Sequence, residues 1–115
     1  HPRYNSRIYL GNNTISSPSV LTIKNDHPLL FDERLLWLMD CDYYKRLHDA
    51  FGEPHVLESI NAVNRIGSHQ ITNIHATEDL KYKEFLYMLE KYEKGVRRHA
   101  FFIIRTFLHL LRKAL

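Results

Sequence analysis

Cysteine is almost absent from this sequence. Cys41 is the single cysteine among 115 residues, so no disulfide can form within the chain. This excludes the small secreted domains that disulfides hold together and favours a reducing, intracellular compartment. No apolar run approaches the roughly 18 residues of a membrane span, and no signal-peptide pattern opens the chain. We therefore expect a protein without a membrane partner.

The residue groupings that catalysis needs are also missing. The four glycines are scattered and form no loop that could cradle a phosphate. No two of the eight histidines show the four-residue spacing of a helical zinc site. Cys41 and His48 would lie about 10 Å apart along a helix, which is too far for a nucleophile and its base. We expect no metal, no cofactor, no small-molecule substrate and no enzymatic activity.

Acidic residues are absent from one end of the chain. The stretch from Lys94 to Leu115 has six basic residues and no Asp or Glu, whereas residues 1–93 carry 10 basic and 13 acidic residues. The net charge of +3 therefore hides a basic C-terminal segment. With 44% hydrophobic and 25% charged residues, the chain has the composition of a globular domain. Because it opens with His1, we expect it to be part of a longer protein.

The first 30 residues differ in composition from the rest. Three of the four prolines lie here, among Asn and Ser residues. Arg7–Leu10 and Val20–Ile23 have the pattern of short strands on either side of a turn region. Since an isolated hairpin is marginally stable, we interpret residues 1–30 as an extended arm or linker. It would lie along a helical interaction domain formed by residues 31–115.

Apolar residues recur at helical spacing throughout that second part. The expected helices cover residues 33–51, 54–66, 69–74, 77–94 and 96–114, with Asp32 as an N-cap of the first and Gly52, Gly67 and Gly95 as breaks. The predicted fold is all-α: a compact bundle of about five helices with an extended N-terminal arm. Six residues at the centres of the apolar stripes are expected to be buried: Ile60, Val63, Leu86, Leu89, Ile103 and Phe107.

The last helix carries the strongest electrostatic signal. Arg98, Arg105, His109 and Arg112 follow one another at spacings of seven, four and three, so they share one helix face. This face could bind phosphates, which makes a nucleic-acid-binding helical domain one alternative function. It could equally be the solvated basic side of an amphipathic helix.

Two aromatic residues beside glycines suggest a docking site instead. Phe51 precedes Gly52 after the first helix, and Tyr92 lies close to Gly95 after the fourth. An aromatic side chain at a turn is often partly exposed, and two of them at one end of a bundle would form an apolar patch for a partner. The other interpretation is that both rings close the end of the bundle.

The segment from residue 52 onward also resembles a known family. Val56, the stripe Ile60-x-Ala62-Val63-x-x-Ile66 and the stretch Ser68-His69-Gln70-Ile71-Thr72 carry the pattern, which Ala76, Leu86, Leu89, Tyr92 and Arg97-Arg98-His99-Ala100 continue. In these residues the chain is similar to the N-terminal domain of transcription elongation factor S-II, the LW domain. The nearest variant is the integrase-binding domain of lens epithelium-derived growth factor. The upstream Asp32-Glu33-Arg34-Leu35 fits the first helix of that domain.

The resemblance implies a nuclear adaptor of transcription or chromatin proteins. In the family, two interhelical loops form a pocket that captures short linear motifs of disordered partners. By register, the pocket residues here are Phe51, Gly52, Glu53, Tyr92, Lys94, Val96 and Arg97. The family's loop aspartate falls on Gly52, so the familiar ligand motif is not expected. A dimerisation module, in which the N-terminal arm pairs with another chain, is a third alternative.

Overall fold

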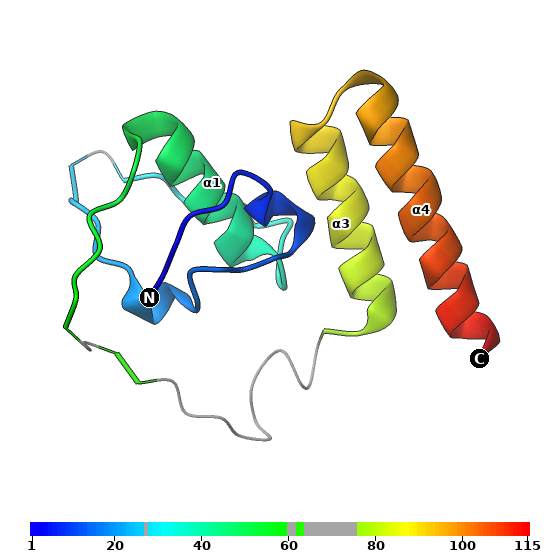
Figure 1. Cartoon of the computed structure of the whole chain (residues 1–115), viewed down its shortest axis with the longest axis horizontal. Coiled ribbons are helices and arrows are strands. Elements are labelled where there is room, and N and C mark those ends of the chain that lie inside the picture. The colour runs from blue at the N-terminus through cyan, green and yellow to red at the C-terminus, as the bar shows by residue number, and fades with distance from the viewer. Residues whose placement is uncertain (27, 60–61, 64–75) are drawn as a thin grey trace.

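The computed structural model of the chain describes residues 1–26, 28–59, 62–63 and 76–115. These residues form helices and no strand (Figure 1). The helices are two short 3-10 helices, η1 (Ile8–Leu10) and η2 (Pro18–Val20), and three α-helices, α1 (Met39–Phe51), α3 (Glu78–Tyr92) and α4 (Gly95–Ala114). The all-α class is confirmed. The expected bundle of about five helices is not matched, since the described part of the chain holds three α-helices.

Both predicted strands are wrong. Arg7–Leu10 turns into η1, which Gly11 closes by donating its backbone N–H to the carbonyl of Ile8 at 3.0 Å. Gly11 has a φ of +93°, a left-handed conformation that glycine adopts without strain, so the turn favours glycine at this position. Val20 ends η2, which begins at Pro18. Ile8 is fully buried against the helices, and this burial stabilises the segment in place of a sheet ladder.

The first long helix begins later than the sequence predicts. Asp32 is not its N-cap: the Asp32 side chain accepts a hydrogen bond from the backbone N–H of Arg34 in a turn, and α1 starts at Met39. Glu84 of α3 binds the backbone at the N-terminal end of α1 in its place. Its carboxylate accepts hydrogen bonds from the backbone N–H groups of Leu36, Trp37 and Leu38 at 2.8, 2.9 and 2.8 Å. A carboxylate is favourable at the positive end of a helix.

The last two predicted helices are confirmed, whereas the second and third are not. Residues 54–59 are exposed and not helical, so the helix predicted at this position is not formed over these residues. The rest of that stretch, apart from residues 62–63, and the short helix predicted at 69–74 lie outside the described residues. Helix α3 confirms the start near Thr77, whose side chain accepts a hydrogen bond from the backbone N–H of Leu80 at 3.2 Å. Helix α4 confirms the last helix to within one residue.

The core lies between η1, the start of α1 and one side of α3. Its members come from all three elements and from the turn before α1: Ile8, Tyr9, Leu35, Leu38, Cys41, Tyr44 and Met88. The N-terminal stretch therefore supplies core residues. In Figure 1, α3 lies between this core and α4, which forms the outer edge of the molecule.

A buried ionic network joins α1 to α3. Asp42 is fully buried. It accepts hydrogen bonds from Arg46 Nε at 2.7 Å, Lys91 Nζ at 2.6 Å and the Tyr92 hydroxyl at 2.5 Å. Lys91 also reaches Asp32 Oδ2 at 2.9 Å. A buried carboxylate requires such partners because an unpaired buried charge is strongly destabilising.

The six residues expected to be buried divide by element. Leu89, on α3, has 2% of its surface exposed, which confirms the prediction, and Leu86 is half-buried. Ile103 and Phe107 on α4 are exposed, as is Val63, so these three predictions are wrong. Ile60 lies outside the described residues. The exposed positions on α4 share one cause, which is the way this helix faces α3.

Candidate functional site

The first part of the predicted pocket lies at the C-terminal end of α1. Phe51 is the last residue of the helix and 70% of its surface is exposed. Gly52 follows with a φ of +82°. Glu53 lies 3.0 Å from His48 Nε2 on the preceding turn. Phe51 therefore projects from a helix end and does not plug the core.

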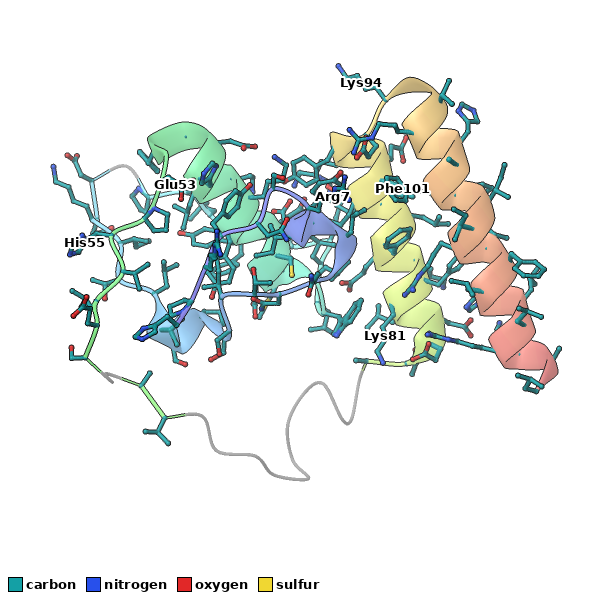
Figure 2. All side chains as sticks on the ribbon, viewed as in Figure 1. Arg7, Glu53, His55, Lys81, Lys94 and Phe101 are labelled. Carbon is teal, nitrogen blue, oxygen red and sulfur yellow. The ribbon has the colours of Figure 1, made fainter. Side chains whose placement is uncertain are left out.

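The second part lies at the connection between α3 and α4. Tyr92 is half-buried: its ring lies 5.4 Å from that of Tyr9, and its hydroxyl is bound to Asp42. Burial, followed by the bond to Asp42, raises the pKa of Tyr92 above its usual range. Val96 is exposed, and Arg97 forms an ion pair with Glu93 at 3.4 Å. Lys94 lies at the tip of the connection (Figure 2).

These two parts do not meet. Tyr92 is tied to Asp42, which precedes Phe51 by nine residues, or about 13 Å along α1. Figure 2 shows Glu53 and Lys94 at well-separated ends of their helices. The pocket that the sequence predicts between the two loops is therefore not formed by Phe51 and Tyr92. Phe51 is an exposed aromatic at the end of α1, and Tyr92 belongs to the buried network.

The predicted basic residues do share one face of α4, and that face is turned toward α3. Arg112 lies 2.6 Å from Glu78, His109 lies 3.2 Å from Asp79, and Arg98 lies 3.8 Å from Glu90. Arg105 lies 5.0 Å over the ring of Phe85, and the ring of His109 stacks on Tyr82 at 4.2 Å. The basic face that could bind phosphates is thus engaged with a neighbouring helix.

The contacts with α4 lower the pKa values of two carboxylates of α3. Hydrogen bonds from Lys81 and then Arg112 lower the pKa of Glu78, and a hydrogen bond from Lys113 lowers the pKa of Asp79. Each acid–base pair is placed nearly symmetrically about the short connection at Glu93 and Lys94. The two helices are therefore joined as an antiparallel hairpin with ion pairs along its seam.

The opposite face of α4 is apolar and turned to solvent. Seven large side chains on it have between 42% and 85% of their surface exposed: Val96, Ile103, Ile104, Phe107, Leu108, Leu110 and Leu111. At 3.6 residues per turn they cover an arc of about 160°. No residue of α4 is buried in the structure as described. We call these seven residues, together with Ala100 and Ala114 on the same side of the helix, the outer face of α4.

The sequence pattern predicted the wrong orientation for the apolar face of α4. An amphipathic helix normally turns its apolar side to the core, and that rule places Ile103 and Phe107 inside. The signal that could have reversed the choice is the acidic spacing on α3. Glu78, Asp79 and Glu90 recur at positions that an antiparallel neighbour would bring opposite the basic residues of α4.

The remaining sequence candidates are local features of α1. Cys41 has 3% of its surface exposed, and burial raises the pKa of its thiol to about 12. A thiol in that state is a poor nucleophile. The ring of His48 stacks on Tyr4 at 3.7 Å. In the part of the chain that the structure covers, no three His, Cys, Asp or Glu residues gather as a metal site would require.

Two further findings concern membrane-spanning helices and similarity to known proteins. Among the helices described here, none combines the length and the apolar character needed to cross a membrane. Comparisons with known protein families, with curated proteins and with solved structures find no match for this chain.

Proposed function

We propose that this chain is a non-enzymatic protein-interaction domain whose docking surface is the outer face of α4. The observation that carries the proposal is the orientation of that helix: its basic side lies against α3, and its apolar side lies in solvent. Contiguous apolar patches of more than a few hundred Å² are uncommon on monomers and usually mark interaction sites.

The size of the outer face supports a protein partner. If a fully exposed large apolar side chain presents about 150–200 Å², the exposed fractions of the seven side chains amount to on the order of 600–800 Å². A standard protein interface buries about 800 Å² on each partner. The face is thus close to the size that a specific complex requires.

The spacing of the outer face favours a helical partner. Val96, Ala100, Ile103, Phe107, Leu110 and Ala114 follow one another at alternating spacings of four and three residues. This is the heptad spacing at which one helix packs its side chains into the gaps of another. A lipid surface has no such gaps and does not require the spacing.

The nucleic-acid alternative has less support. Arg98, His109 and Arg112 each have a carboxylate of α3 within 4 Å, so phosphate binding would have to displace those pairs. A nuclear location and a role in transcription or chromatin are the part of the proposal that rests on the sequence resemblance alone. The stretch that carries most of that resemblance lies outside the described residues.

The proposal is tested by comparing two matched phenylalanine variants. Phe107→Glu places a charge in the middle of the outer face, and Phe51→Glu makes the same change at a similarly exposed residue of α1. We expect proteins that co-purify with the full chain to be lost with Phe107→Glu and kept with Phe51→Glu, with circular dichroism unchanged in both. Loss with Phe51→Glu alone would place docking at the predicted loops and overturn the proposal.

A further inference from the structure

Six of the nine residues that form the outer face of α4 are spaced symmetrically about one position. The six residues with alternating spacing are arranged about position 105, so that Val96 corresponds to Ala114, Ala100 to Leu110, and Ile103 to Phe107. In two of these pairs, an alanine corresponds to a larger side chain. A second α4, turned end to end, would therefore place its Leu110 opposite Ala100 of the first and its Val96 opposite Ala114.

We infer that the occupant of the outer face is a second copy of this chain, bound through an antiparallel pair of α4 helices with a twofold axis near position 105. The inference rests on the proposed function, because it names the partner of the same surface. Two-fold dimers with self-complementary faces are the commonest oligomers. Small residues opposite large ones allow close helix packing without voids.

Charge does not oppose this arrangement. Arg112 and Lys113 near one end of α4 are paired with Glu78 and Asp79 of the same chain. Arg97 at the other end is paired with Glu93. An antiparallel pair brings the two basic ends together, and these internal ion pairs largely neutralise them before the copies meet. Arg112 lies beside the outer face and not within it, and Arg97 lies at its N-terminal edge, where its guanidinium is paired with Glu93.

The N-terminal arm does not supply this contact. Ile8 and Tyr9 are buried in the core of their own chain, and the Tyr9 hydroxyl donates a hydrogen bond to Glu93 Oε1. Burial and the bond to Glu93 raise the pKa of that hydroxyl to about 12. The dimerisation alternative drawn from the sequence placed the contact in the arm, whereas the inferred contact uses α4.

The first experiment measures self-association of the purified full chain by sedimentation velocity. We expect a dimer that forms in the micromolar range, about 1 to 100 µM. Phe107→Glu should weaken it at least about 100-fold, because an unpaired carboxylate would then be buried against Ile103 of the second copy. Phe51→Glu should leave it unchanged. A wild-type chain that stays monomeric throughout would overturn the inference.

The second experiment tests the direction of pairing. Chains with Ala100→Cys and chains with Leu110→Cys, made with different masses, are mixed and treated with a short bismaleimide. Antiparallel pairing predicts mostly mixed products, because two copies of residue 100 would be about 15 Å apart along the pair. Mostly like-with-like products would overturn it. Cys41 does not interfere, since its thiol is buried and its pKa is raised to about 12.

The remaining outcomes separate the inference from the proposed function. A monomeric chain that still loses a different co-purifying protein with Phe107→Glu would end the inference and keep the docking surface. A monomeric chain that sediments with phosphatidylserine-containing vesicles, and fails to do so with Phe107→Glu, would show a lipid-facing helix and would overturn both.

Discussion

At the scale of single residues, the carboxylate of Asp32 ties the turn before α1 to other parts of the fold. Arg34, Tyr87 and Lys91 all donate hydrogen bonds to its carboxylate. These bonds, with that of Arg34 the strongest, hold the pKa of Asp32 well below its usual range. The turn before α1 is thereby tied to α3.

This lowered pKa predicts a loss of stability in acid. In the unfolded chain Asp32 takes up its proton near pH 4, whereas the folded chain resists protonation, so its stabilising contribution is complete above pH 4 and falls as the pH drops further. Urea unfolding at pH 7 and pH 3 should show a larger loss for the wild-type chain than for Asp32→Asn. Equal losses would mean that the carboxylate is not held as described.

Leu89 and Phe107 should respond oppositely to truncation. Leu89 is buried with 2% of its surface exposed, and Phe107 is 61% exposed. Leu89→Ala should cost about 2–5 kcal/mol of unfolding free energy, as deletions of buried leucines do. Phe107→Ala should cost under about 0.5 kcal/mol when the chain is dilute enough to be monomeric. A large loss in the dilute Phe107 variant would show that α4 faces inward.

At the scale of elements, the start of α1 depends on a side chain from another helix. Glu84→Gln keeps the shape of the side chain but replaces one acceptor oxygen with a donor, so at least one of the three backbone N–H groups before α1 loses its partner. An unpaired buried donor costs about 1–3 kcal/mol. We expect that loss in urea unfolding, together with faster amide exchange at Trp37 and Leu38. The exposed Glu90→Gln is the control and should show neither effect.

The elements also show what local sequence can and cannot predict. Helix α3 was predictable because Thr77 is a good N-cap and an apolar line follows it, both of which are local features. The start of α1 was not, because it depends on Glu84, which lies 46 to 48 residues away. The basic residues of α4 were correctly placed on one face, but their partners on α3 could not be read from α4 alone. The same long-range pairing decided which way Phe107 points.

At the scale of the whole molecule, the chain is a small core with an amphipathic hairpin at its edge. The inferred dimer links folding to association, because a partner that binds only the folded chain raises its stability by mass action. The urea midpoint of the wild-type chain should therefore rise as protein concentration increases from about 1 to 100 µM. The midpoint of Phe107→Glu should stay constant. A wild-type midpoint that does not change with concentration would contradict the dimer.

The outer face of α4 is the centre of this account, and photo-cross-linking from position 107 tests it most directly. A photoreactive phenylalanine analogue at position 107 of the full chain, irradiated in cells, should give protein adducts, including one of twice the mass of the chain. The same analogue at position 51, which is similarly exposed, should give far less. Equal labelling from the two positions, or no protein adduct from position 107, would contradict the outer face of α4 as a docking surface.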